Sequence, residues 1–426
     1  MTALSLALGI DFGTSGVRAA VVNPQRHLCW QYRQAYPECP APGGWRQALF
    51  ELLAALPGAI APQIGAVAID GTSGTVLLCD RAGASLTPPL LYNHSCRDSL
   101  EAIRAIAPAH SPAASATSSL AKLVWWHRAL PSPLWHQAAC LLHQADWLSA
   151  QLHGQWGLSD YHNSLKLGYD VGRLGYPDWM QGQPWSRVLP RVLAPGERVG
   201  TVTAAVAQRF GLSPHCQVAA GTTDSIAAFL ASGAGAPGDG VTSLGSTLVL
   251  KLLSDRRVDV GEYGIYSHRL GNHWLVGGAS NSGGAVLEQF FDRATLAALS
   301  QRIDPAVPTD LDYYPLSQPG ERFPINDPGL APRLSPRPED DGAFLHGLLV
   351  GIARIEQRGY DLLTRHGASP LRQVFTAGGG AANETWRQLR ADLLPVPIKN
   401  AASVEAAVGS AYLALGWPPQ AGGTIT

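Results

Sequence analysis

Lysine is scarce in this chain, and its scarcity excludes one large class of nucleotide site. Only four lysines occur among the 426 residues, and none of them follows a glycine. They are Lys122, Lys166, Lys251 and Lys399. The P-loop motif of many nucleotide-binding proteins ends in Gly-Lys-Ser/Thr, where the lysine reaches the phosphates. The chain therefore has no P-loop, and any phosphate that it binds must be held by other groups.

Charged residues of all kinds are also few. They make up 15% of the chain, and 31 basic residues nearly balance 32 acidic ones, for a net charge of −1. Without a basic excess, strong non-specific binding to nucleic acid is excluded. No apolar run approaches the ~18 residues of a membrane span, and the amino-terminal stretch lacks the basic region of a signal peptide. We therefore expect a soluble, cytoplasmic protein that binds neither nucleic acid nor a membrane.

The six cysteines include no Cys-x-x-Cys pair. A chain of this length with 46% hydrophobic residues can bury sizeable cores without disulfides. Free thiols in a reducing compartment are therefore expected. The length also predicts at least two domains.

Segments with strand and helix periodicity alternate along the chain, which predicts an α/β fold. Residues 6–22 and 241–253 each have the pattern of two strands joined by a Gly-Ser/Thr turn, and this echo predicts a duplicated fold. Residues 64–80 repeat that pattern, and residues 141–154 predict a helix that ends at Gly154. We also expect strand–turn–helix units over 218–233 and 373–394, helices over 45–56, 121–130, 343–363 and 404–416, and a proline-rich loop or lid over 304–340.

The first motif with chemical potential is the turn that follows Asp11. Gly13 and Gly16 allow the backbone to turn tightly and approach an anion, and successive backbone N–H groups in such a turn form an anion-binding concavity. The hydroxyls of Thr14 and Ser15 add donors to phosphate oxygens. Asp11 ends the preceding strand, where it can hold Mg²⁺ directly or through water. The alternative is a plain β-hairpin with Asp11 as a turn residue.

A second motif places Asp224 between a strand and a helix, within Gly221–Ser225. There a carboxylate can act as the general base that takes a proton from a hydroxyl as the hydroxyl attacks phosphorus. The alternative is an ordinary helix N-cap, because Asp and Thr are both good N-cap residues.

Two further turns could contact a nucleotide and a sugar. The glycines of Gly378–Asn383 allow backbone to lie flat against an adenine or ribose, with Asn383 supplying an amide and Trp386 packing near the base. The small polar turn Asp70–Gly74 suits contacts to sugar hydroxyls. The alternatives are a βα turn without a ligand and a tight structural turn, respectively.

Taken together, these motifs resemble the FGGY family of carbohydrate kinases, within the actin-like ATPase superfamily. The resemblance covers nearly the whole chain in the family's order. Its segments are GIDFGTSGVR (9–18), AGTTDSIAAFL (220–230), TSLGSTLVL (242–250), FTAGGGAANETWRQLRADLLPVPI (375–398) and EAAVGSAYLA (405–414). Within the family, the sequence is most similar to the short ketopentose kinases of cyanobacterial and plant type, which are xylulokinase-like but act on D-ribulose.

The resemblance implies two actin-like (ribonuclease H-like) domains that flank a nucleotide- and sugar-binding cleft. The N-terminal domain is expected over 1–230 and the C-terminal domain over 231–426, with the last helix, about 402–417, packing back on the N-terminal domain. ATP and Mg²⁺ are the implied cofactors. A small-molecule sugar is the implied partner of a monomer or homodimer.

The resemblance also assigns roles to individual residues. It makes Asp224 the catalytic base, places Asp11, Ser73 and Asp224 on the sugar, and makes Asp11 and Asp224 the metal-binding positions. The nucleotide-binding positions that it implies are Gly13, Thr14, Ser15, Ser243, Gly245, Ser246, Thr247, Gly378, Gly379 and Asn383.

The chain departs from the family pattern in two ways. It is shorter than most members, so some of the family's insertions and lid elements are missing. It also has Thr72-Ser73-Gly74 where xylulokinases have Met-His-Gly. The second departure favours an acceptor other than D-xylulose. The expected reaction is transfer of the γ-phosphoryl group of ATP to a primary hydroxyl of D-ribulose, giving D-ribulose 5-phosphate. The alternatives are a D-xylulose kinase and an actin-like ATPase without a sugar acceptor.

Overall fold

The computed structural model describes residues 6–36, 41–108 and 111–416. The chain forms two compact units. Unit 1 comprises Met1–Ala231 together with Glu405–Thr426, and unit 2 comprises Ser232–Val404. Each unit contains a mixed β-sheet and helices, as the alternating sequence pattern predicts. Among the described residues, no helix combines the length and the apolar character that crossing a membrane would need.

The main sheet of unit 1 has the strand order β3-β2-β1-β4-β10-β9, and β11 pairs with β4 beyond β10. The first three strands form an antiparallel meander, whereas β4 runs parallel to β1, and β10 and β11 run parallel to β4. Parallel strands end at the same edge of a sheet, so the polar residues after β1, β4 and β11 are brought together there. The strands are β1 (Leu6–Phe12), β2 (Gly16–Val22), β3 (Leu28–Ala35), β4 (Ile64–Gly71), β9 (Arg198–Thr201), β10 (Gln217–Ala219) and β11 (Thr222–Thr223).

Two predictions for unit 1 are wrong in part. The strands at 64–80 exist, but β5 (Val76–Cys79) leaves the main sheet and pairs with β6 (Cys140–His143). The predicted helix over 141–154 accordingly begins as a strand and becomes helical only at α5 (Gln144–His153). It ends, as expected, at Gly154, whose φ of 75° is in the left-handed region that favours glycine.

The remaining elements of unit 1 surround these sheets. The two short strands β7 and β8 pair in parallel. The elements are α1 (Pro42–Ala54), α2 (Leu100–Arg104), α3 (Ser119–Ala129), α4 (Ser132–Gln137), β7 (Leu158–Asp160), α6 (Tyr161–Ser164), β8 (Arg191–Leu193), α7 (Ala204–Phe210) and α8 (Asp224–Ala231).

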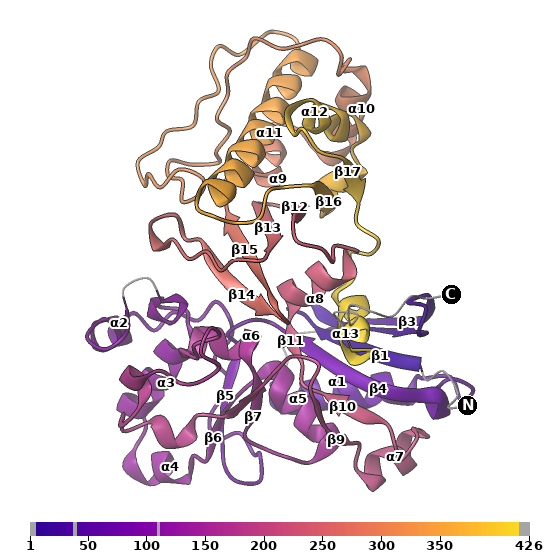
Figure 1. The fold of residues 1–426 in the computed structure, drawn as a ribbon, viewed down its shortest axis with the longest axis vertical. Coiled ribbons are helices and arrows are strands. Elements are labelled where there is room, and N and C mark those ends of the chain that lie inside the picture. The colour runs from indigo at the N-terminus through magenta and orange to yellow at the C-terminus, as the bar shows by residue number, and fades with distance from the viewer. Residues whose placement is uncertain (1–5, 37–40, 109–110, 417–426) are drawn as a thin grey trace. The chain divides into compact units, whose positions relative to one another are not determined.

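The helix α13 (Ala406–Ala414) packs on α8 and β1 of unit 1, although it lies at the other end of the sequence. Figure 1 shows this yellow helix beside the indigo strand β1. Glycine makes the packing close. A Cβ on Gly9 would lie 1.9 Å from the Ala407 carbonyl oxygen, and one on Gly409 would lie 1.8 Å from the Ala227 carbonyl oxygen. A side chain at Gly9 would therefore push α13 away from β1, and one at Gly409 would push it away from α8.

The sheet of unit 2 has the strand order β14-β15-β13-β12-β16-β17. The hairpin predicted over 241–253 is present as β12 and β13, and β16 runs parallel to β12. The strands are β12 (Asp239–Leu244), β13 (Leu248–Ser254), β14 (Tyr266–Leu270), β15 (His273–Ala279), β16 (Gln373–Ala377) and β17 (Ile398–Asn400). The helices are α9 (Gly284–Glu288), α10 (Arg293–Arg302), α11 (Asp341–Arg365) and α12 (Glu384–Leu393).

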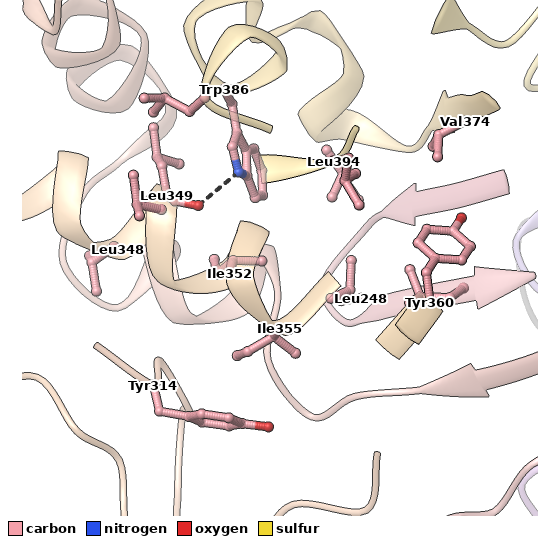
Figure 2. Packing of buried hydrophobic residues seen from close by; sticks show 14 of the residues in the cluster. Leu248, Tyr314, Leu348, Leu349, Ile352, Ile355, Tyr360, Val374, Trp386 and Leu394 are labelled. Carbon is pink, nitrogen blue, oxygen red and sulfur yellow. Dashed lines mark hydrogen bonds between the residues drawn. The ribbon is translucent and has the colours of Figure 1, made fainter. Parts of the chain in front are cut away.

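The core of unit 2 is built around α11, the long helix that the sequence predicts. Figure 2 shows Leu348, Ile352 and Ile355 of this helix among the buried side chains of the cluster. The loop 304–340 contributes to the same core, because Tyr313, Tyr314, Leu316 and Phe323 are buried in it. This segment, all of which the structure describes, has no helix or extended strand, as predicted. Of the two expectations for this segment, a loop or a lid, the structure shows a loop whose aromatic side chains pack into the core of unit 2.

Candidate active site

Two carboxylates lie next to each other at the polar edge of the unit 1 sheet. Asp11 of β1 and Asp70 of β4 are paired in the parallel register, and Thr222 of β11 is the partner of Asp70 on its other side. Asp11 is 4% exposed and Asp70 is fully buried. Arg18 Nη1 donates to Asp11 Oδ2 at 2.9 Å, and Ser410 Oγ of α13 donates to Asp70 Oδ2 at 2.6 Å. The last helix therefore contacts the centre of the site directly.

The environment of this pair makes its two members unequal. Burial raises the pKa of Asp11, while hydrogen bonding to Asp70 and to Arg18 lowers it. Burial raises the pKa of Asp70 well above its usual value, and the charge of Asp11 raises it further. Apart from this carboxyl–carboxyl contact, no described residue donates to Asp11 Oδ1 or to Asp70 Oδ1. Asp70 is therefore the member of the pair that takes up a proton first as the pH falls, and Asp11 is the member held beside the Arg18 guanidinium.

Asp70 should make the stability of the protein depend on pH. Its pKa in the folded state is raised above 3.8, so its contribution is fully present below that pH and is lost as the pH rises toward the folded-state pKa. Asn has a similar shape, cannot ionise and can still accept from Ser410. We therefore expect Asp70→Asn to be more stable than wild type at pH 8 by about 1 kcal/mol or more, with the difference shrinking toward pH 4.5. Urea unfolding at pH 4.5, 6 and 8 measures this difference. A difference that is the same at all three pH values would contradict the assignment of the proton to Asp70.

The predicted phosphate turn lies between β1 and β2. The Gly13 N–H donates to the Gly16 carbonyl at 3.1 Å, which closes the turn. Thr14 and Ser15 are exposed at its tip, so their hydroxyls and N–H groups are open to a ligand. A Cβ on Gly13 would lie 3.2 Å from Arg18 Nη1, so glycine leaves room for the guanidinium that pairs with Asp11.

Asp224 begins α8 directly after β11, and it is half-buried. Residues from α6 hold the strand that precedes it. His162 Nδ1 contacts Thr222 Oγ1 at 2.7 Å, and Asn163 Nδ2 donates to the Thr222 carbonyl at 3.2 Å. The sequence analysis missed these two supporting residues. The signal that could have found them is the N-cap Asp160, which accepts hydrogen bonds from the N–H groups of both.

In the turn after β4, one hydroxyl side chain has hydrogen-bond partners within the protein and the next one has none among the described residues. Thr72 is buried, and its hydroxyl is within hydrogen-bond distance of Thr75 Oγ1 (2.6 Å) and Gln144 Oε1 (3.0 Å). Ser73 is half-buried, and no described residue hydrogen-bonds its hydroxyl. The Ser73 hydroxyl is therefore available to a ligand at this edge of the sheet, whereas Thr72 holds the turn in place.

Unit 2 contains a pocket of about 960 Å³. Three segments form its walls: the turn between β12 and β13, the helices α9 and α10, and the glycine turn with the start of α12. Of the predicted nucleotide-binding residues, Gly245, Ser246, Gly379 and Asn383 line it. Gly378 lies behind them, because a Cβ there would meet the Leu244 carbonyl group at 2.7 Å. A volume of this size suits a ligand as large as a nucleoside.

One wall of this pocket was missed in the sequence. The helices α9 and α10 contain none of the glycine turns selected in the sequence, yet they supply eight of the twenty lining residues. Their lining residues are Gly284, Leu287, Glu288, Arg293, Leu296, Ala297, Ser300 and Gln301.

Asn383 and Trp386, which follow the glycine turn of unit 2, both make hydrogen bonds within the protein. Asn383 Oδ1 accepts from the Trp386 N–H at 3.0 Å as the N-cap of α12, and Asn383 Nδ2 donates to Ser300 Oγ at 2.8 Å. A primary amide has two N–H groups, so Asn383 keeps one for a ligand. Trp386 was expected near a base, but it is 2% exposed and its indole N–H donates to the Leu349 carbonyl at 3.1 Å (Figure 2). Trp386 thus lines the pocket while its indole N–H is already bonded within the core.

Comparison with known proteins matches both units to one family. The model described as the N-terminal domain of the FGGY family of carbohydrate kinases matches residues 6–231, and the model of the family's C-terminal domain matches residues 240–416. A "Xylulose kinase" of Bacillus subtilis (strain 168) is 24% identical, covering 97% of this chain and 89% of that protein. A "Ribulokinase" of Shouchella clausii (strain KSM-K16) is 26% identical over 47% of this chain and 40% of that protein. The solved structure of a "xyloylose kinase" from Brucella ovis has a TM-score of 0.82 and 23% identity, covering 96% of this chain and 90% of that one, which shows a shared fold.

Proposed function

The chain belongs to the FGGY family of carbohydrate kinases, and from that premise we propose that it transfers the γ-phosphoryl group of ATP to a primary hydroxyl of D-ribulose. The observation that carries the choice of sugar is the turn after β4. It presents the small Ser73 hydroxyl to a ligand, where xylulokinases have the bulkier Met-His-Gly. A serine hydroxyl can both donate and accept a hydrogen bond. It can therefore bind a sugar hydroxyl whose configuration differs from that in D-xylulose.

D-Xylulose is the second candidate acceptor. It is favoured by the names of relatives that match along nearly the whole chain, whereas the ribulokinase match covers about half of it. At an identity of 24%, two proteins with one fold can act on different sugars. We therefore base the choice of sugar on the residues of the turn and not on the names of the relatives.

We assign the proton transfer to Asp224. The sugar hydroxyl attacks the γ-phosphorus, a new O–P bond forms, and the bond from that phosphorus to the β–γ bridging oxygen breaks to release ADP. The hydroxyl proton passes to the Asp224 carboxylate. We place the sugar against Asp11 and Ser73 at the same sheet edge, where Asp70 is the register partner of Asp11.

Nucleotide binding is proposed for glycine turns in both units. In unit 1, Gly13, Thr14 and Ser15 would face phosphate oxygens. In unit 2, the turn Ser243–Thr247 would face phosphates, and Gly378, Gly379 and Asn383 would hold the adenosine. The unit 2 pocket supports this assignment, because its walls bring the two turns together.

Magnesium is proposed at the carboxylates Asp11 and Asp224. The donor set fits Mg²⁺, which favours one or two carboxylates together with substrate phosphates over a closed protein cage. Among the described residues, no three His, Cys, Asp or Glu side chains cluster into such a cage. Asp11 keeps acceptor capacity after its bonds to Arg18 and Asp70. When bound, the ion would neutralise phosphate charge.

An ADP-release assay with Mg-ATP against a panel of acceptors tests the proposal. The panel contains D-ribulose, D-xylulose, L-ribulose, ribitol, xylitol and glycerol, with a control that lacks sugar. We expect D-ribulose to give the highest kcat/KM. A preference for D-xylulose would replace the first candidate by the second, and ADP release that no sugar alters would favour an ATPase without a sugar acceptor.

A further inference from the structure

Two of the four lysines of this chain converge on the turn that carries Ser73. Lys122 of α3 is fully buried, and its Nζ donates to the Gly74 carbonyl at 2.6 Å and to the Leu91 carbonyl at 2.7 Å. These two bonds satisfy a buried ammonium group and anchor the turn from behind. Lys122 is therefore a structural residue.

Lys166 approaches the same turn from another segment, the short 3-10 helix Leu165–Leu167. A Cβ on Gly74 would lie 3.9 Å from Lys166 Cδ, so the alkyl chain of the lysine passes directly beside the turn. The side chain is half-buried. Burial lowers the pKa of Lys166, while the nearby carboxylate of Asp224 raises it. The alkyl chain thus lies beside the turn that carries Ser73, and the charge of Asp224 acts on the ammonium group.

The two lysines differ in how their ammonium groups are satisfied. Within the part of the chain that the structure describes, no group accepts a hydrogen bond from Lys166 Nζ. An ammonium group has three donors, and those of Lys166 remain available to solvent or to a ligand, because the side chain is only half-buried. An oxygen atom of a ligand beside the turn could accept a hydrogen bond from this ammonium group.

The polar groups at this sheet edge complement a particular pattern of ligand oxygens. Asp11 and Asp224 accept hydrogen bonds when ionised and therefore suit sugar hydroxyls, which donate. The Ser73 hydroxyl can do either. Lys166 only donates, so the best partner for it is an oxygen that only accepts. In the open-chain form of a ketopentose, the ketone oxygen is the only oxygen that accepts hydrogen bonds without donating one.

We propose that Lys166 contacts the substrate, and that its ammonium group donates a hydrogen bond to the ketone oxygen so that the enzyme prefers a ketopentose to the corresponding alditol. This inference rests on the proposed function, and it makes the open-chain ketose the form that binds.

The test compares D-ribulose with ribitol in wild type and in Lys166→Met, which keeps an unbranched side chain without the charge. Loss of a hydrogen bond from a charged donor should raise KM for D-ribulose about 10- to 100-fold. Ribitol has no ketone, so its inhibition constant against D-ribulose should change less than about threefold. The KM for ATP should stay as in wild type. Lys399→Met, at an exposed lysine that donates to Gln373 in unit 2, is the matched control and should leave all of these values unchanged.

Each other outcome overturns a specific statement. Equal losses of affinity for D-ribulose and ribitol would overturn the ketone contact, and so would a fall in kcat with unchanged KM for D-ribulose. If wild type itself phosphorylates no ketopentose, both the proposed function and this inference are wrong. If wild type is active and Lys166→Met matches it, the inference alone fails. Should Lys166→Met not fold, Lys166→Leu, which also lacks a donor, makes the same comparison, with its folded state checked by thermal unfolding.

Discussion

Replacing Asp224 by Asn is expected to lower kcat for sugar phosphorylation about 10²- to 10⁴-fold. The side chain begins α8, where an aspartate can serve either as a helix N-cap or as a general base. Asn and Asp are equally good N-cap residues, so this substitution keeps any capping function while it removes the group that accepts the proton. A steady-state assay of ADP release with saturating sugar and Mg-ATP measures the effect.

Two controls separate loss of the base from general damage. The dissociation constant for ATP, measured by calorimetry, should not change. Asp178→Asn, at an exposed aspartate of unit 1, should turn over like wild type. Near-normal turnover in Asp224→Asn would show that Asp224 only caps the helix, and another group would then have to take the proton.

Replacing Arg390 by Met is expected to destabilise the protein by about 3–5 kcal/mol. Arg390 and Glu356 form a fully buried ion pair in unit 2, with Nε donating to Oε2 at 2.6 Å and Nη2 donating to Oε1 at 2.8 Å. Removing the guanidinium leaves the Glu356 carboxylate buried without its counter-charge. Urea unfolding of the wild type and the variant measures the loss.

The ion pair also connects the two strands that lead to the nucleotide turns. Thr242 of β12 donates to Glu356 Oε1 at 2.5 Å, and Arg390 Nη1 donates to Thr376 of β16 at 2.8 Å. Both strands run into turns that line the pocket or lie behind it. We therefore expect ATP affinity to fall in Arg390→Met as well, even where the variant is still folded.

A double variant separates the loss of the arginine from the charge that it leaves behind. Glu356→Leu/Arg390→Met removes both charges, so it should be more stable than Arg390→Met alone. If Glu356→Leu/Arg390→Met is less stable than Arg390→Met, the account is contradicted. That result would mean that Glu356 stabilises the protein even without Arg390.

The parts of the fold that depend on local pattern were predictable. The hairpins β1–β2 and β12–β13 have tight turns between short apolar strands, and α11 has enough turns to show helical periodicity clearly. Pairing between distant segments was harder. β4 and β5 follow one another with the same pattern as a hairpin, yet they join different sheets, because alternation does not specify the partner strand. Cys140–His143 was taken into a helix because so short an apolar run suits either structure.

The candidate site shows the same division. Asp11 lies near the end of β1, and Ser73 and Asp224 follow β4 and β11, so a local signal was enough to select these positions. The burial of Asp70 beside Asp11, and its contact with Ser410, depend on parallel register and on a helix more than three hundred residues away along the chain. The proximity of Lys166 to the turn that contains Gly74 likewise follows from no local pattern. Such long-range contacts require the three-dimensional structure.

The central claim is that this chain phosphorylates a primary hydroxyl of a ketopentose, and the identity of the product tests it most directly. The enzyme, Mg-ATP and uniformly ¹³C-labelled D-ribulose would be incubated together, and the product would be examined by ³¹P and ¹³C NMR. We predict one sugar phosphate for each ADP, with carbon–phosphorus coupling at C5 and its neighbour. Formation of ADP and inorganic phosphate with the labelled sugar unchanged would contradict the account.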